Sequence, residues 1–299
     1  MISLFAWKID HTLYDIVRDA VKDIGLDINI IGLDHPEAGM NLSYYNSDNP
    51  QIYDKPFFLY IEEYRTFQNE AILTHHNFRG FISHIKNTCE ILWNNHKTKV
   101  FHVPLSSKDK AVDTVSKHID SLNQRPVNLI AWSSWNDIHD NNFFNRGGSL
   151  VNQLFIDLVE HGCDVTLSLR TLKNLSAKER FPQRVRVYRE YMKKEDMDNI
   201  FSNGDLFLLP SVQVHSVSLT YAMSFGMPSV VSEGWGINEF CNDINSINIK
   251  NIDKIVELCN NREELKTKRR NTFSFYSTNY SDISYPQRLQ TALELGLSL

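Results

Sequence analysis

Cysteine is scarce in this chain, and no long apolar run is present. The 299 residues include 4 cysteines that stand far apart, in neither a Cys-x-x-Cys pair nor a Cys/His spacing typical of metal ligands. We therefore expect buried free thiols in a reducing, cytoplasmic compartment. No apolar stretch approaches the roughly 18 residues that span a bilayer, and residues 2–7 are too short for a signal peptide, so we expect no membrane-spanning segment.

The usual nucleotide-binding signatures are also missing. The sequence contains neither a Gly-x-Gly-x-x-Gly fingerprint nor a phosphate-binding loop ending in Gly-Lys-Ser/Thr, and the Arg-Gly-Gly at 146–148 matches neither. The net charge of −5 argues against a surface dominated by polyanion binding, although it is compatible with a local basic groove. The charged run at 262–270, REELKTKRR, is typical of a solvated helix face, with a polyanion-binding patch as the alternative.

What the chain does have is a steady alternation of strand and helix patterns. This alternation predicts parallel sheets with right-handed crossovers, so the expected fold class is α/β. Helices are expected between most of the strands, for example at 148–160, where apolar residues form a single stripe. Strands are predicted at residues 2–7, 27–33, 56–64, 99–105, 127–134, 163–170, 184–191, 205–211, 229–232 and 246–250.

A polar segment at residues 106–126 divides the chain. It carries one weak helix and ends in Arg-Pro, which favours a linker. We therefore expect a small N-terminal domain at residues 1–124 and a C-terminal domain at residues 125–299, whose last helices can pack back on the first domain. The polar loop at 34–55 is long enough to be functional and is a candidate lid.

The stretch from Asp205 to Glu239 is the most informative part of the sequence. It holds two apolar runs, each followed by a loop of small and polar residues, with a short helix between them. In an open parallel sheet, ligands bind at the carboxyl ends of the strands, where helix N-termini offer unpaired N–H groups to anions. The stretch therefore predicts a site for a phosphate-bearing ligand.

Several motifs follow one another between Val127 and Ile249. They are a strand with a polar loop, Phe-x-Arg-Gly-Gly, a helix and a strand, Asp-Leu-Phe-Leu-Leu-Pro-Ser, then Tyr-Ala-Met-Ser-Phe-Gly-Met-Pro-Ser-Val-Val-Ser, and finally Gly-x-x-Glu. This series resembles the C-terminal half of the glycosyl transferases group 1 family, nucleotide-sugar enzymes of the GT-B fold. The resemblance implies two Rossmann-like domains with parallel sheets facing a cleft, the N-terminal one smaller than the family usually has.

The resemblance also implies a donor site on the C-terminal domain. Arg146 stands where the family has a basic residue, and a cation there would neutralise the departing diphosphate. The loop at 215–218 would donate backbone N–H groups and hydroxyls to phosphate. No Asp-x-Asp occurs in a suitable loop, so we expect no need for a metal ion. The implied donor-site residues are Ser133, Ser134, Arg146, Gly147, Arg189, His215, Ser216, Val217, Ser218, Tyr221 and Glu239, with Arg189 and Tyr191 at the place of base recognition.

The chain departs from the family at its paired glutamates. The family has two of them eight positions apart, whereas Gln213 and Tyr221 occupy these positions here. The second glutamate usually holds the ribose through two hydrogen bonds, and a phenol offers only one donor and one acceptor. Ribose recognition is therefore expected to differ. The resemblance implies retention of anomeric configuration, which the missing glutamates leave open.

Each of these residues also has a structural alternative. His215 can simply line a loop, Ser216 and Ser218 can cap the following helix, and Tyr221 can serve in packing. Residues that could act on an acceptor, as general base or by stabilising an oxocarbenium-like sugar, lie at predicted strand ends of the first domain. They are Asp10, His11, Glu62 and Glu63.

The predicted activity is transfer of a hexosyl or pentosyl group from a nucleotide-diphosphate sugar, such as a UDP-sugar, to an acceptor hydroxyl. A saccharide is the usual acceptor in the family. One alternative is a phage-type enzyme that glycosylates a hydroxymethylated base in duplex DNA, which the compact, Asn-, Ile- and Lys-rich sequence would suit. The other is a non-catalytic subunit that binds nucleotide sugars.

Overall fold

The computed structural model describes residues 2–7, 17, 19–24, 28–33, 56–61, 73–107, 109–132, 146–190 and 192–298. The chain divides into two compact units, the first made of residues 1–107 with 280–299 and the second of residues 108–279. This division precedes helix α4 (Val112–Asp120), whereas the boundary expected at 124–125 follows it. The last helix, α13 (Tyr285–Ser298), belongs to the first unit.

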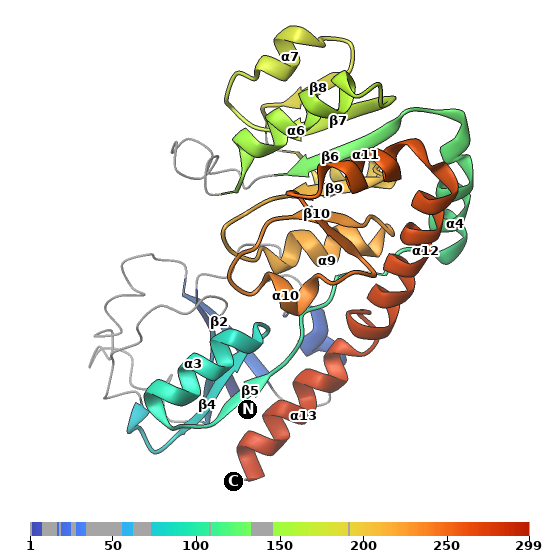
Figure 1. Ribbon diagram of the computed structural model, residues 1–299. Helices are drawn as coiled ribbons and strands as arrows, with labels where there is room; N and C mark the ends of the chain where they lie inside the picture. Colours follow the sequence, from blue (N-terminus) through green and yellow to red (C-terminus); the bar gives the residue numbers. More distant parts are fainter. Residues whose placement is uncertain are drawn as a thin grey trace. The chain divides into compact units, whose positions relative to one another are not determined.

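The first unit is built on a parallel sheet of five strands (Figure 1). Every strand pair in it is parallel, and the spatial order is β2-β1-β3-β4-β5. Helix α3 (Lys86–His96) connects the last two strands. The strands are β1 (Ile2–Trp7), β2 (Ile28–Leu33), β3 (Phe57–Ile61), β4 (Phe78–Ser83) and β5 (Val100–His102).

Helix α13 packs on this sheet through a glycine. All five residues of β3 are buried, and a Cβ on Gly296 would overlap the ring of Phe58. A polar contact also joins the helix to the sheet, because the Tyr60 hydroxyl lies 3.5 Å from the hydroxyl of Tyr285. The same Tyr60 hydroxyl lies 3.1 Å from Nδ1 of His84. The first unit therefore consists of segments from both ends of the chain.

The second unit contains a parallel sheet of six strands in the order β11-β10-β9-β6-β7-β8. Its strands are β6 (Val127–Trp132), β7 (Val165–Arg170), β8 (Val185–Tyr188), β9 (Leu206–Leu209), β10 (Ser229–Val231) and β11 (Ser246–Asn248). Its helices, besides α4 and the short η3 (Ser121–Gln124), are α6 (Gly148–Glu160), α7 (Ser176–Arg180), α8 (Lys194–Ser202), α9 (Ser216–Ser224), α10 (Ile237–Phe240), α11 (Ile252–Asn260) and α12 (Arg262–Asn279).

Helices cover both faces of this sheet. Side chains of α6, α7 and α11 join alternate strand residues, such as Leu129 and Leu167, in the main apolar core. On the other face, Phe201 of α8 contacts the rings of Phe207 and Trp132. The predicted α/β class with parallel sheets is thus confirmed, and the alternation of strands and helices is what places the helices on both faces.

A buried carboxylate joins α12 to the amino end of β9. Asp205, which has no exposed surface, accepts hydrogen bonds from Arg125 at 2.5 and 2.8 Å, from the Asn128 amide at 2.8 Å and from the buried Arg269. Burial raises the pKa of Asp205, but the His118 hydrogen bond and the charges of Arg269 and Arg125 hold that pKa well below its usual range. Arg269 therefore does not lie on a solvated face, and the sequence prediction for residues 262–270 is wrong at this position.

All four cysteines are buried free thiols, as predicted. None of the helices in the described part of the chain is long and apolar enough to span a membrane.

Candidate functional site

The second sheet has a point where the direction of its connections reverses. Strands β6 and β9 are neighbours, and α6 leaves β6 on one face of the sheet while α9 leaves β9 on the other. The crevice outside the carboxyl ends of two such strands is where open α/β sheets bind ligands. The N-termini of both helices lie at this edge, where the backbone N–H groups of a first helical turn have no acceptor within the helix.

Gly147 brings the start of α6 against the end of β9. It caps α6 in the left-handed conformation, with φ 75° and ψ 25°, and a Cβ there would overlap the carbonyl oxygen of Pro210. Only glycine meets both conditions without strain. The Arg-Gly-Gly motif and the Pro-Ser motif are far apart in the sequence, but they therefore pack directly against each other in the fold.

The loops that follow β9 and β10 are held together by backbone hydrogen bonds. The Val214 amide donates to the Trp235 carbonyl at 2.8 Å, and the Trp235 amide donates to the Val212 carbonyl at 3.1 Å. The Ser232 hydroxyl donates to the Ser211 carbonyl at 2.6 Å. These bonds fix the residues that lead into α9 and α10.

Arg146 and His215 lie close enough at this edge for the charge of one to act on the other. Burial and, to a smaller extent, the charge of Arg146 together lower the pKa of His215 to about 3. His215 is therefore a neutral hydrogen-bonding group at physiological pH, while Arg146 carries the positive charge. His215 directly precedes α9, and Ser216, Val217 and Ser218 form the first turn of that helix. The structure thus places this group of expected donor-site residues together.

Three other expected donor-site residues have different surroundings. The Tyr221 hydroxyl donates to Asp198 of α8, and its ring lies edge-on against Phe201. Arg189 is exposed and holds a neighbouring loop by donating to the Leu172 carbonyl at 2.9 Å. Glu239 lies in the first turn of the short helix α10. Tyr221 and Arg189 therefore have structural contacts of their own, and their contacts with a nucleotide stay predictions.

The remaining candidates lie outside the described residues. They are Asp10, His11, Glu62, Glu63, Ser133, Ser134 and, from the base-recognition pair, Tyr191. Their roles stay predictions.

Sequence reasoning missed three residues at the same edge. Trp132, Arg170 and Tyr188 are the last residues of β6, β7 and β8, and they are paired in register across the three strands. The Arg170 guanidinium lies 5.8 Å from the Trp132 ring, and the rings of Trp132 and Tyr188 lie 5.7 Å apart. The signal that could have found them is that each predicted strand places a polar or aromatic residue at its carboxyl end.

Trp132 and Arg170 line one narrow crevice together with Arg146. The crevice lies at the carboxyl ends of β6, β7 and β9, with Gly148 of α6 at its border. Trp132 is only 6% exposed, and among the described residues nothing accepts a hydrogen bond from its Nε1. A buried donor left unpaired is costly, so a bound group that accepts this hydrogen bond would be favoured.

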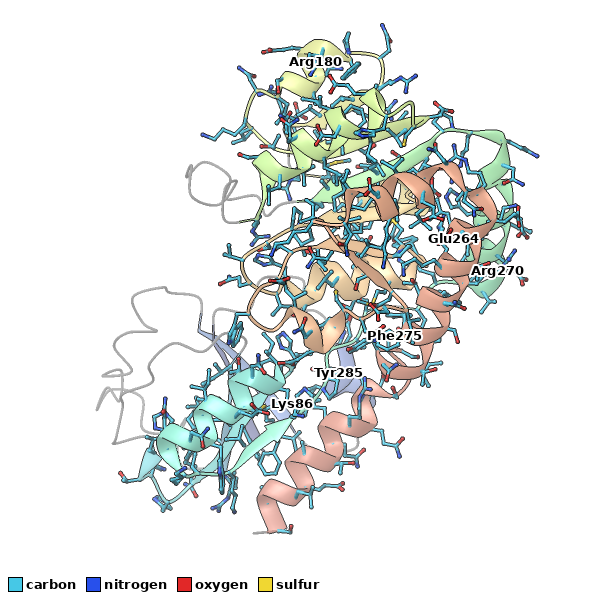
Figure 2. All side chains as sticks on the ribbon, in the orientation of Figure 1. Lys86, Arg180, Glu264, Arg270, Phe275 and Tyr285 are labelled. Atoms are coloured by element: carbon cyan, nitrogen blue, oxygen red, sulfur yellow. The ribbon has the colours of Figure 1, made fainter. Side chains whose placement is uncertain are left out.

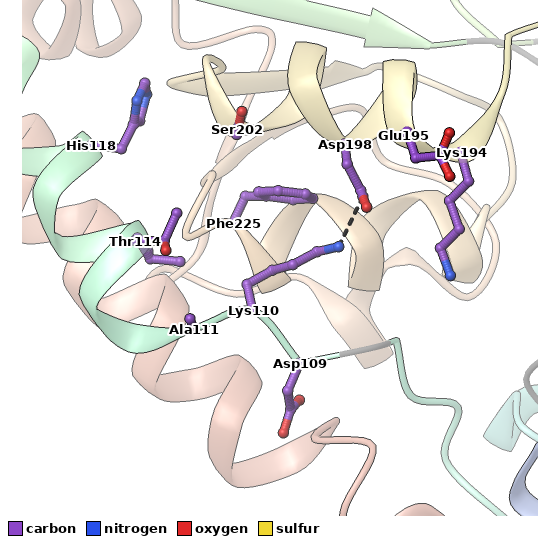
Figure 3. Close-up of a pocket in the computed structure, with 11 residues that line it drawn as sticks. Asp109, Lys110, Ala111, Thr114, His118, Lys194, Glu195, Asp198, Ser202 and Phe225 are labelled. Atoms are coloured by element: carbon purple, nitrogen blue, oxygen red, sulfur yellow. Dashed lines mark hydrogen bonds and ion pairs between the residues drawn. The ribbon is translucent and has the colours of Figure 1, made fainter.

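A larger pocket, of about 460 Å³, lies elsewhere on the second unit (Figure 3). It is lined by α4, by α8 and by the end of α9. The Lys110 ammonium bonds Asp198 at 2.8 Å and lies 4.6 Å from the centre of the Phe225 ring. These charges are already paired with each other, so the pocket has no clear preference for an anion.

Among the described residues, no group of three or more His, Cys, Asp or Glu side chains could hold a metal ion. Whether phosphates bind here without a metal stays a prediction.

Several solved structures share this architecture. A structure of WaaG, a glycosyltransferase involved in lipopolysaccharide biosynthesis, covers 97% of this chain and 98% of its own, with a TM-score of 0.64 and 10% identity. A trehalose-6-phosphate synthase covers 98% and 99%, with a TM-score of 0.61 and 8% identity. The fold is GT-B. No protein-family model and no curated protein sequence matches the chain.

Another GT-B neighbour contains ligands. A variant of S. aureus TarM in complex with fondaparinux, alpha-GlcNAc-glycerol and UDP is 15% identical, with a TM-score of 0.62. It covers 93% of this chain, which spans 58% of the length of that TarM chain. At these identities the likeness establishes the GT-B fold alone.

Proposed function

We propose that the protein is a glycosyltransferase that moves a hexosyl or pentosyl group from a nucleotide-diphosphate sugar to an acceptor hydroxyl. The observation that carries the proposal is the convergence of Arg146, neutral His215 and two helix N-termini at the strand-reversal point of a GT-B sheet. These groups give the edge a positive potential from one guanidinium and two helix N-termini. It suits a diphosphate, whose negative charge grows as the bond from sugar to oxygen breaks.

In this proposal Arg146 stabilises the departing nucleoside diphosphate. Its fork of N–H donors matches two phosphate oxygens, and the amides at the starts of α6 and α9 supply further donors. His215, neutral beside Arg146, can donate one hydrogen bond to the sugar or the phosphate. The acceptor, a saccharide or another hydroxyl compound, is proposed to bind the first unit, with Asp10, His11 or Glu62 as the base.

UDP is the first nucleotide to test, because the TarM variant holds UDP. Retention is proposed from the sequence resemblance, and enzymatic glycosyl transfer with retention was studied in the trehalose-6-phosphate synthase neighbour. We also propose metal-independent turnover, to be checked with a chelator. Cytoplasmic placement is proposed because the four thiols are free and disulfides are rare in that compartment.

The decisive experiment compares wild type with Arg146→Ala. We expect UDP release from UDP-sugars to fall about 100-fold in the variant, as when one electrostatic stabiliser of a transition state is removed. Arg180→Ala is the matched control, because Arg180 lies on the outer surface at α7, where it pairs with Glu160 (Figure 2). Unchanged turnover in Arg146→Ala would remove Arg146 from the mechanism.

The same preparation separates binding from catalysis. In a thermal-shift screen, a nucleoside diphosphate that binds should raise the unfolding temperature of the protein, because a ligand at 100 times its Kd adds about 2.7 kcal/mol to stability. A shift without any nucleotide release from donor sugars would indicate a non-catalytic binding subunit. Duplex DNA is not proposed as acceptor, since Arg269 of the charged run is buried against Asp205.

A further inference from the structure

We propose that Cys163 and Cys259 form an oxidation site, a thiol pair that hydrogen peroxide closes to a disulfide bond within the folded protein. Both residues belong to the second unit, Cys163 two residues before β7 and Cys259 in the last turn of α11. Cys163 therefore lies at the amino edge of the sheet, whereas Arg146 and His215 lie at its carboxyl edge. The proposal does not depend on the proposed function.

The two thiols are in contact although they come from distant parts of the sequence. The Sγ atom of Cys163 lies 4.0 Å from the carbonyl oxygen of Val256, which precedes Cys259 by about one turn of α11. A hydrogen bond joins the two thiols directly. Both side chains belong to the main apolar core, where each is 1% exposed. A disulfide needs the sulfur atoms to approach to about 2 Å, and the packing already holds them within hydrogen-bonding reach of each other.

The surroundings of Cys163 favour its thiolate form. The hydrogen bond from the Cys259 thiol holds the pKa of Cys163 below that of an ordinary thiol, against the effect of burial. The charges of His161 and Arg262 lower this pKa in addition. The same hydrogen bond, together with burial, raises the pKa of Cys259. Because the thiolate is the nucleophile, Cys163 is the sulfur that attacks the oxidant and Cys259 is the resolving thiol.

A small oxidant can reach Cys163 through the turn that contains it. His161, Gly162 and Asp164, on both sides of this cysteine, are exposed. A Cβ on Gly162 would meet nothing within 4 Å, so the space beside the turn is open. Hydrogen peroxide is little larger than water, and a brief local opening of such an exposed turn is enough to admit it.

One molecule of hydrogen peroxide oxidises the pair in two steps. The Cys163 thiolate attacks one peroxide oxygen, the O–O bond breaks, and the sulfur becomes a sulfenic acid while the other oxygen leaves as hydroxide. The sulfur of Cys259 then attacks the sulfenic sulfur, the S–O bond breaks, and the departing hydroxide takes up the Cys259 proton. The two thiols together lose two electrons and two protons, and the peroxide is reduced to two waters. A dithiol reductant restores the thiols by exchange.

The other two cysteines are also buried but have different surroundings. In the first unit, the Sγ atom of Cys89 lies 3.8 and 3.9 Å from the carbonyl oxygens of Ser83 and Phe101. Burial raises the pKa of Cys241 to about 12, so its thiolate is scarce at neutral pH. Both cysteines are therefore expected to stay reduced and provide matched controls.

The test treats the reduced, intact protein with hydrogen peroxide, alkylates the remaining thiols with N-ethylmaleimide in denaturant and maps the disulfides by peptide mass spectrometry. We expect a bond between Cys163 and Cys259, with Cys89 and Cys241 alkylated. Cys259→Ser should instead leave Cys163 as a sulfenic acid that dimedone traps. Cys89→Ser and Cys241→Ser should form the bond as wild type does.

Thermal unfolding tests whether the bond fits the native packing. Oxidised wild type should unfold about 5–10 °C above reduced wild type, because the bond closes a loop of about 100 residues in the unfolded chain. Cys163→Ser should unfold at the same temperature with and without peroxide. An oxidised wild type that unfolds at or below the temperature of the reduced protein would overturn the proposal.

Three results of the peptide map would also overturn it. They are four alkylated cysteines after peroxide treatment, a bond that includes Cys89 or Cys241, and a bond that forms only when urea has unfolded the protein first. The map requires wild type alone, so a serine variant that does not fold leaves this test complete. Nucleotide release from donor sugars is not part of any of these measurements, so the proposed function and this inference can fail separately.

Discussion

A single glycine decides how closely the start of α6 approaches the end of β9. Gly147 has a positive φ and faces the Pro210 carbonyl, so two separate constraints act on one position. Gly162, after α6, has nearly the same φ of 78°, but a Cβ there would meet nothing within 4 Å. The two glycines therefore allow backbone strain and steric overlap to be measured separately.

We predict that Gly147→Ala costs more stability than Gly162→Ala. The second change should cost about 1–2 kcal/mol, the usual cost of a left-handed residue, because nothing opposes the added methyl group. The first adds overlap with Pro210 and should also weaken UDP binding, since the start of α6 must move. Urea denaturation and UDP titration check this, and equal unfolding free energies for the two variants would contradict it.

The buried Asp205 gives a second residue-scale prediction. Asp205→Ala leaves Arg269 as a buried charge without its carboxylate, so we expect a loss of about 3–5 kcal/mol in unfolding free energy. Glu160→Ala breaks the exposed pair with Arg180 and should cost about 0–1 kcal/mol. Urea denaturation of both variants measures the difference. A loss for Asp205→Ala as small as that for Glu160→Ala would show that water reaches Arg269.

At the scale of elements, α13 depends on a close approach to β3. Gly296→Ala places a methyl group against the buried ring of Phe58, and we expect a loss of about 1–3 kcal/mol from overpacking. Leu295→Ala, one residue earlier and 51% exposed, should change stability by only about 0.5 kcal/mol. Thermal unfolding compares them. If Gly296→Ala is as stable as Leu295→Ala, the helix can shift along the sheet without loss.

The helices and strands were the part of this structure that the sequence predicted best, because burial against a sheet dictates the spacing of apolar residues. The strand at β6, the helix α6 and the strand at β7 follow directly from apolar runs, a single stripe and alternation. The ion pair between Arg269 and Asp205 could not be predicted from this pattern. Periodicity shows which face of a helix is polar, but a buried cation is visible only when its carboxylate, on another element, is known.

The candidate site was predictable in part for a similar reason. Arg146, Gly147 and His215 belong to motifs whose order could be recognised, and Gly147 proves to contact Pro210 of the next motif. Trp132 and Arg170 belong to no motif. They become neighbours only through the register of β6 with β7, and register is a property of the folded sheet that a single sequence does not display.

At the scale of the whole molecule, buried histidines should make stability depend on pH. Burial, with a smaller contribution from His102, lowers the pKa of His84 to about 3, and the pKa of His215 is also lowered to about 3. The unfolded chain binds protons on both near pH 6.5, so this stability is complete above pH 6.5 and is lost as the pH falls toward about 3.

We therefore predict that the unfolding free energy falls by about 1.4 kcal/mol per pH unit for each of these histidines between pH 6 and 4. Urea denaturation of wild type and His84→Gln at several pH values measures the slope. The variant should be less stable at pH 7 and should show a shallower decline with acid. An identical slope in the two proteins would show that His84 takes up its proton without unfolding.

The return of α13 to the first unit has a consequence for synthesis on the ribosome. Domains usually fold in the order in which they emerge, so the N-terminal unit would ordinarily finish first. Here residues 108–279 emerge whole before α13 appears, while the first unit must wait for Tyr285 and Gly296. The unit translated first is thus completed last, and a stop codon anywhere before α13 leaves Phe58 uncovered in a nascent chain whose second unit is already complete.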